Sequence, residues 1–235
     1  MTGLDFLIRA FGDAFRLILS GDPEVYGAVS VSLQVAGTAT VITTLLGIPL
    51  AFLIYGNRFR GRHLVITFLN TLMALPTVVV GLFVYAFITR RSILGPLDLL
   101  FSKKAMIIGE VVLALPIVIA LAGSAVVSLD RSVKETARTL GAGPSRVLAT
   151  ILWEGRLAFA TAVAAAFGRL IGEVGVSMIL GGNIAGVTRN IPTAIATETS
   201  KGEFSLAMAL GIVLMALALG VNFVLRYAQG RGESP

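Results

Sequence analysis

The stretch AMIIGEVVLALPIVIALAGSAVV, residues 105–127, decides the fold, since its only ionisable residue is Glu110. About 20 apolar residues in a helix, rising about 1.5 Å each, cross a hydrocarbon core of about 30 Å. A helix also satisfies its own backbone hydrogen bonds inside lipid. The stretch therefore predicts a membrane-spanning helix.

Four further apolar runs on either side of this stretch have similar length and character. The chain is 56% hydrophobic and 14% charged, with a mean hydropathy of +0.89, which lies beyond the range of soluble domains. The runs are too long and too uniformly apolar for the strands of a barrel. We therefore predict an all-α integral membrane protein with about five transmembrane helices, at residues 28–54, 64–88, 105–127, 157–180 and 204–226.

The first 24 residues have a different pattern. Apolar residues recur at helical spacing from Leu4 to Ile18, with charged residues interleaved at almost every turn. Such charges argue against both a further span and a signal peptide. We predict an N-terminal interfacial amphipathic helix, with an elbow at Asp22-Pro23-Glu24 that directs the chain into the membrane.

Residues 129–155 form a polar segment between the third and fourth predicted spans. Its sequence, LDRSVKETARTLGAGPSRVLATILWE (129–154), predicts a helix, a glycine turn and a second helix. Ser132 and Glu135 have the spacing of a capping box, which fixes a helix start. Gly141, Gly143 and Pro144 are suited to end this helix and begin the next.

Glu135, Ala137 and Gly141, followed by Ile151, resemble the EAA loop of the membrane subunits of type I ATP-binding-cassette (ABC) importers. Thr136 occupies the position of a second alanine in that family. The resemblance implies that the loop docks onto a cytoplasmic ATPase subunit. The residues that would make this coupling contact are Ser132, Glu135, Thr136, Ala137, Leu140, Gly141 and Pro144.

Two ionisable residues, Arg169 and Glu173, lie four apart in the fourth predicted span. Each costs about 2.5–3.5 kcal/mol at mid-bilayer, so we expect them to form an ion pair. The pair either lines the translocation pathway or its gate, or locks this helix against its neighbours. Glu110 is expected near the outer end of its span, hydrated and without a partner, with a pathway role as the alternative.

Pro76 and Pro116 each close an Ala-Leu-Pro triplet within a predicted span. A proline removes one helical hydrogen bond, so each is expected to bend its helix. Bent helices leave room for a cavity at the midplane, although prolines also occur in ordinary spanning helices. Both prolines are therefore candidate pathway residues.

Residues 181–203 are rich in Thr, Gly and Asn and too short to cross the membrane twice. We expect a re-entrant or surface loop on the outer side, in which Asn183, Arg189 and Thr193 are candidate contacts for an anion. The alternative is that the loop docks an external binding protein or packs the bundle. GRLIGEVG (168–175) resembles the fourth-span region of oxyanion permeases of the molybdate and tungstate type. The run that ends in TAIATETSKGEF (193–204) resembles the tungstate type more closely, a type related to molybdate and sulfate permeases.

This resemblance implies one permease domain over residues 1–235 that translocates an oxyanion, most readily tungstate. It also implies a homodimer, two ATPase subunits that bind ATP and Mg, and an extracytoplasmic binding protein. Molybdate, sulfate, phosphate or another small solute stay open as substrates. A slight excess of arginine and lysine on the side of segment 129–155 favours a cytoplasmic loop. The expected orientation in a prokaryotic cell membrane is then N-terminus outside and C-terminus inside.

Other classes of function fit the sequence less well. There is no Gly-rich phosphate loop, no cysteine and one histidine, His63, so we expect no ATPase, catalytic or metal site in the chain. A secondary transporter needs a coupling carboxylate, whereas Glu173 has Arg169 as its predicted partner. The net charge of +6 comes from clusters at the membrane edges, which favours lipid headgroups over nucleic acid as the partner.

Overall fold

The computed structural model describes residues 3–129, 136, 139–141 and 143–230, and every regular element within these ranges is helical. In chain order the elements are α1 (Gly3–Leu19), α2 (Pro23–Tyr55), α3 (Arg62–Met73), α4 (Thr77–Ile88), the 3-10 turn η1 (Gly95–Leu97), α5 (Lys103–Ser128), α7 (Pro144–Glu154), α8 (Arg156–Ile171), α9 (Gly175–Gly181), α10 (Ile191–Lys201) and α11 (Phe204–Gly230).

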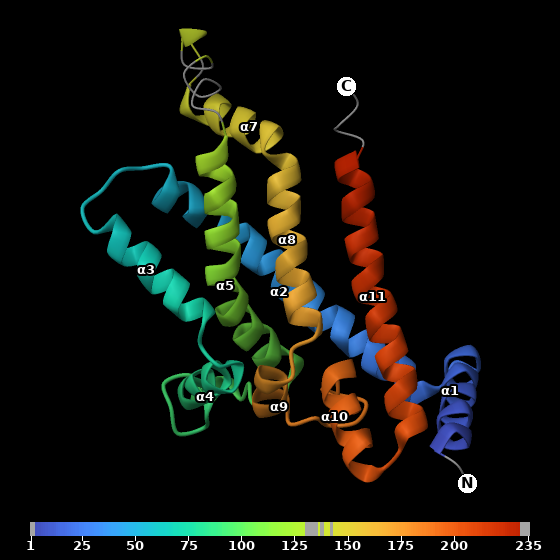
Figure 1. Ribbon diagram of the computed structural model, residues 1–235. Helices are drawn as coiled ribbons and strands as arrows, with labels where there is room; N and C mark the ends of the chain where they lie inside the picture. The colour runs from blue at the N-terminus through green and yellow to red at the C-terminus, as the bar shows by residue number, and fades with distance from the viewer. Residues whose placement is uncertain (1–2, 130–135, 137–138, 142, 231–235) are drawn as a thin grey trace.

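Helices α5, α8 and α11 stand side by side, and α2 crosses behind them and packs against all three (Figure 1). Small residues line the contacts within the bundle, among them Ala36 and Ala39 of α2 and Ala114 of α5. Large apolar side chains such as Leu45 and Leu219 are exposed on the outside. Small residues at helix contacts and large apolar residues facing outward are typical of a helical bundle in lipid.

Three helices in the described part of the chain are long and apolar enough to cross a membrane, namely α2, α5 and residues Phe204–Val224 of α11. Two broken pairs raise this number to five if each pair counts as one span. The pair α3 and α4 is bent by 103°, and the pair α8 and α9 by 59°. The prediction of about five spans is confirmed. The span at residues 64–88 is bent where Pro76 predicted a bend, and the span at residues 157–180 is divided into α8 and α9 by a break that was not predicted.

The two prolines expected to bend helices behave differently. Pro76 lies in the break between α3 and α4, where it is the N-cap residue of α4. The residue before a proline is driven away from the helical region, which ends α3 ahead of it. Pro116 lies inside α5, which continues as one helix from Lys103 to Ser128.

The predicted N-terminal helix and elbow are both present. Helix α1 packs against α11, with Ala10 and Ala14 buried in that contact region. The side chain of Asp22 accepts hydrogen bonds from the backbone N–H groups of Glu24 (2.9 Å) and Val25 (3.2 Å), and Pro23 starts α2. This cap and first-turn proline fix the point at which the chain turns into the long helix.

The segment 181–203 contains more regular structure than the sequence interpretation predicted, because α10 occupies about half of it. Asn190 and Thr193 form a reciprocal capping box at the start of α10, and Pro192 lies in its first turn. Gly202 ends the helix in the left-handed conformation with φ of 84°. The predicted re-entrant or surface loop thus contains a short capped helix, which the sequence analysis did not identify.

Candidate functional site

The predicted coupling segment lies at the opposite end of the molecule from α9 and α10 (Figure 1). Three of its predicted contact residues, Ser132, Glu135 and Ala137, lie outside the described residues. Leu140 is 82% exposed, and Gly141 has a φ of 77°, which favours glycine. This turn thus leaves an apolar side chain open to a partner.

The second helix of the segment is present as α7, which begins at Pro144 with Gly143 as its N-cap. Its end joins α8 through a local contact. The guanidinium of Arg156 lies 4.9 Å from the ring centroid of Trp153 and donates a 2.9 Å hydrogen bond to the Trp153 carbonyl. Helix α7 is thereby tied to the first turn of the spanning helix α8.

At the break between α8 and α9, Arg169 and Glu173 form the predicted ion pair, with 2.7 Å between Nη1 and Oε2. The Glu173 side chain is 2% exposed and that of Arg169 is 42% exposed. Glu173 lies beyond the end of α8, and its Oε1 accepts a 3.2 Å hydrogen bond from the N–H of Val176 in α9. One carboxylate therefore links the end of α8 to the start of α9.

A second buried carboxylate, Glu110 of α5, faces the same short helix. It is 1% exposed, and Oε1 accepts a 3.3 Å hydrogen bond from the Ser177 hydroxyl of α9. The other oxygen, Oε2, has no hydrogen-bond partner in the described protein. The expectation that Glu110 stays hydrated without a partner is wrong, because α9 covers this part of α5.

The Ser177 hydroxyl extends this contact to α10, since it accepts a 3.0 Å hydrogen bond from Asn190 Nδ2. Asn190 Oδ1 in turn accepts hydrogen bonds from the N–H (3.0 Å) and hydroxyl (2.8 Å) of Thr193. The next residue, Ile191, donates its N–H to the Ser32 hydroxyl of α2 at 2.8 Å. Helices α2, α5, α9 and α10 are thus joined by one set of buried polar contacts, which we call the polar chain, comprising Ser32, Glu110, Ser177, Asn190 and Thr193.

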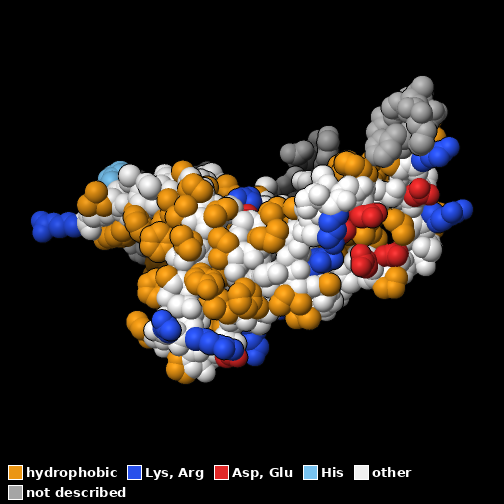
Figure 2. Space-filling view, turned by 90° about the horizontal axis from the view of Figure 1, so that it is seen from below, with side chains coloured by type: hydrophobic (Ala, Val, Ile, Leu, Met, Phe, Trp, Pro, Cys, Tyr) orange, Lys and Arg blue, Asp and Glu red, His pale blue; other side chains and the backbone are white. Residues whose placement is uncertain are grey.

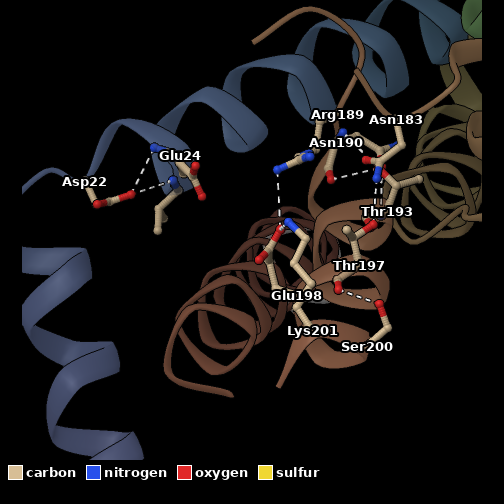
Figure 3. Close-up of polar contacts among 11 residues, drawn as sticks. Asp22, Glu24, Asn183, Arg189, Asn190, Thr193, Thr197, Glu198, Ser200 and Lys201 are labelled. Carbon is tan, nitrogen blue, oxygen red and sulfur yellow. Dashed lines mark hydrogen bonds and ion pairs between the residues drawn. The ribbon is translucent and has the colours of Figure 1, made fainter. Parts of the chain in front are cut away.

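Helix α10 and the residues just before it carry a group of charged side chains beside Asn190 and Thr193 of the polar chain (Figure 3). The carboxylate of Glu198 pairs with Arg189 (Nη1 to Oε1, 3.3 Å) and with Lys201 (Nζ to Oε1, 2.9 Å). Asn183 donates a 2.6 Å hydrogen bond to the Thr197 hydroxyl. Arg189 Nε and Asn183 Oδ1 are buried and have no partner in the described protein. These two atoms are the unsatisfied polar groups of the region around α10.

Close backbone approach holds α9 between α4 and α5. A Cβ on Gly109 of α5 would meet the side chains of Leu180 and Val176, with only 2.5 Å to Val176 Cγ1. On the α4 side, a Cβ on Gly175 would lie 2.6 Å from Thr77 Oγ1. The glycines allow the short helix to lie directly against its neighbours, so α9 has little freedom to shift while both contacts persist.

The structure brings some of the sequence-predicted pathway residues together and separates others. Arg169 and Glu173 pair at the α8–α9 break, and Asn183, Arg189 and Thr193 share the corner around α10. Pro76 and Pro116 belong to other elements, the α3–α4 break and α5.

Sequence reasoning missed Ser32, Ser177 and Glu198. Glu198 was detectable from its spacing to Lys201, three residues later in a capped helix. Ser32 and Ser177 carry no local signal, because their partners are 159 and 67 residues away in the chain.

The chemistry available at this end of the molecule is polar binding and positioning. Among the residues that the structure describes, no group of three or more His, Asp or Glu side chains is arranged to hold a metal ion. The polar side chains at this end carry hydroxyl, amide, guanidinium and carboxylate groups, and most of them are buried.

Comparison with known sequences identifies close relatives. Residues 43–231 match the binding-protein-dependent transport system inner membrane component family. The chain is 38% identical to the tungstate uptake system permease protein TupB of Campylobacter jejuni, over 94% of this chain and 92% of that one. It is 36% identical to TupB of Peptoclostridium acidaminophilum, over 94% and 97%. The molybdenum transport system permease protein ModB of Escherichia coli K12 is 33% identical, over 84% and 90%.

Solved structures agree on the fold. An inward-facing structure of the MetNI methionine ABC transporter superposes with a TM-score of 0.71 at 15% identity, over 87% of this chain and 94% of that one. An amino acid ABC transporter crystallised with histidines gives 0.69 at 15% identity, over 92% and 98%. The fold is that of the type I ABC importer transmembrane subunits. The chain belongs to the family of inner membrane components of binding-protein-dependent transport systems.

Proposed function

We propose that the chain is the membrane-spanning subunit of an ATP-driven importer for an oxyanion, with tungstate as the preferred substrate. The observation that carries this proposal is the match to two tungstate uptake permeases over more than nine-tenths of each chain. The lower identity to the molybdenum permease makes molybdate the second candidate. In this role residues 1–235 act as one permease domain, with segment 129–155 as the coupling loop.

The functional unit is proposed to be a homodimer, because a bundle with up to five spans among the described residues does not readily enclose a gated pathway alone. A groove of about 710 Å³ between α2, α8 and α11 supports this arrangement. Small residues line much of it, including Gly37, Ala160, Ala164 and Gly220. Such residues allow close approach of a helix from a second copy.

Two cytoplasmic ATPase subunits, which bind the ATP and Mg, are proposed to engage the coupling loops. The exposed Leu140 and the turn at Gly141 support this role. The loop would then lie in the cytoplasm of a prokaryotic cell. Helix α1 and the C-terminal end of α11 lie at opposite ends of the molecule, with the end of α11 on the same side as α7 (Figure 1). This arrangement agrees with an external N-terminus and an internal C-terminus.

An extracytoplasmic binding protein is proposed to deliver the oxyanion to the end that carries α9 and α10. ATP-driven closure of the ATPases would favour one of two packings of the bundle, and hence open the pathway to one side at a time. The chain performs no covalent step in this account. The ion pair of Arg169 and Glu173, together with Asn183, Arg189 and Thr193, is proposed to act at the gate. Pro76 at the α3–α4 break and Pro116 within α5, which lie in other elements, are proposed to permit movement of the bundle.

The proposal is tested by measuring tungsten accumulation in a host that lacks oxyanion importers. The chain is expressed with its ATPase and binding protein, and tungstate, molybdate and sulfate are supplied separately and in competition. We expect accumulation of tungsten that molybdate suppresses only in excess. Equal uptake of sulfate, or uptake of molybdate in preference to tungstate, would contradict the assignment of substrate.

A further inference from the structure

A pocket of about 450 Å³ lies at the end of α4, outside the groups described above. Its walls are the last turn of α4, the connection to α5 and the residues just before α5. The residues that line it are Tyr85, Thr89, Arg90, Arg91, Asp98, Leu100 and Phe101. We propose that this pocket binds the phosphate group of an anionic membrane phospholipid.

The connection that forms the pocket is tightly organised. The hydroxyl of Ser92 donates to the carbonyls of Phe87 and Thr89, the latter at 2.7 Å. A Cβ on Gly95 would collide with the Arg90 carbonyl, so only glycine permits this close turn. At the far wall, the N–H of Phe101 donates a 2.9 Å hydrogen bond to the Leu180 carbonyl of α9. The pocket is therefore held in shape by the fold.

The donors at the pocket match a phosphate group. Arg90 is oriented by Asp98, with 3.1 Å between Nε and Oδ1. Within the described part of the chain, no acidic side chain lies within ion-pair distance of Arg91. Tyr85 and Thr89, which also line the pocket, each carry a hydroxyl group. Arginine guanidinium groups and hydroxyl groups commonly donate hydrogen bonds to phosphate oxygens.

The surroundings of the pocket favour a lipid over a free anion. Ile93 of the connection is 85% exposed, and Leu97 of η1 and Phe87 in the last turn of α4 are also exposed. Figure 2 shows basic side chains framed by hydrophobic ones at the edge where Figure 1 places the end of α4. A phospholipid supplies a phosphate and acyl chains together, and basic residues beside apolar ones are typical of headgroup contacts.

Native mass spectrometry of the purified full chain provides the test. The protein is released from micelles containing phosphatidylglycerol, phosphatidylcholine or inorganic phosphate without lipid. The wild type is expected to retain phosphatidylglycerol in preference to phosphatidylcholine. Arg91→Gln should weaken this retention about fivefold, as expected for one basic residue at an anionic surface. Adding Thr89→Ala to Arg91→Gln should weaken the retention of phosphatidylglycerol further.

Lys104→Gln is the matched control, since it removes an exposed positive charge nearby without touching the pocket. It should retain phosphatidylglycerol like the wild type. The proposal is overturned if Arg91→Gln retains phosphatidylglycerol as well as the wild type does. It is also overturned if Lys104→Gln loses as much of this lipid as Arg91→Gln. Stable binding of inorganic phosphate that excludes the lipid also overturns it, since the site would then serve a free oxyanion. Circular dichroism of each variant shows whether the fold is intact, and Thr89→Ala alone keeps the test open if Arg91→Gln does not fold.

Discussion

Glu173 joins two helices through its two oxygens, one on the Arg169 guanidinium of α8 at 2.7 Å and the other on the Val176 N–H of α9 at 3.2 Å. The pair therefore spans the point at which the fourth membrane segment bends by 59°. In a continuous helix, Arg169 and Glu173 would lie on one face and pair only with each other. The break makes the carboxylate a link between a long helix and a short one.

The first prediction concerns this ion pair. Arg169→Ala leaves the buried Glu173 without its cation, and we expect it to lower the free energy of unfolding by about 1–3 kcal/mol. This is less than for a fully buried pair, because Arg169 is partly exposed. Arg169→Ala/Glu173→Gln should recover part of the loss, because no buried charge is then unpaired. Denaturant titration in detergent measures both, and strictly additive effects would remove the argument for coupling.

The polar chain gives the second prediction. Ser177→Ala removes the one hydrogen bond that the Glu110 carboxylate makes in the described protein and leaves Asn190 Nδ2 without its Ser177 partner. We expect a loss of about 1–3 kcal/mol in unfolding free energy, the typical cost of unsatisfied buried polar groups. Ser124→Ala, at an exposed position of α5, is the control and should be neutral. A neutral Ser177→Ala would show that the polar chain does not hold α9.

The third prediction tests the close packing of α9 against α5. Gly109→Ala would push a methyl group into the buried side chains of Leu180 and Val176, and should destabilise the protein by about 1–3 kcal/mol. Gly168→Ala in α8 is the matched control, because nothing lies within 4 Å of its Cβ. The control should stabilise helix α8 slightly. Thermal unfolding in detergent compares the two, and equal midpoints would argue against a tight α5–α9 contact.

The coupling turn provides the fourth prediction. Gly141 has a φ of 77°, which costs a β-branched residue about 1–2 kcal/mol. Gly141→Val should leave membrane insertion intact and abolish copurification of the ATPase. Gly141→Asn tolerates the left-handed conformation and should retain the ATPase. Normal copurification of the ATPase with Gly141→Val would show that this turn is not needed for binding the ATPase.

Much of the fold was predictable from the sequence, because apolar length fixes the spans and capping residues fix the helix ends. The helix α1, the elbow at Asp22 and the start of α7 at Pro144 all followed from local signals. The Arg169–Glu173 pair followed from its four-residue spacing. These features depend on neighbours close in the chain, which is why one sequence sufficed.

The features that were missed depend on contacts between distant segments. The expectation that Glu110 is hydrated was wrong because α9 covers this residue. No residue near position 110 in the sequence indicates that contact. The bend at Pro76 was predicted from the proline, whereas the break near Gly172 was not, because hydropathy reports the length of an apolar run but not a break within it. The capped helix α10 was overlooked because the polar composition of its segment outweighed the Asn190 and Gly202 signals.

The central claim is that this chain transports an oxyanion only when a separate ATPase supplies the energy. The most direct test is tungstate uptake by proteoliposomes that contain the chain, its ATPase and its binding protein, with ATP on the ATPase side. We predict accumulation against a gradient with ATP and none without it or with an ATPase that cannot hydrolyse it. Uphill accumulation by the chain alone, without any nucleotide-hydrolysing partner, would contradict the account.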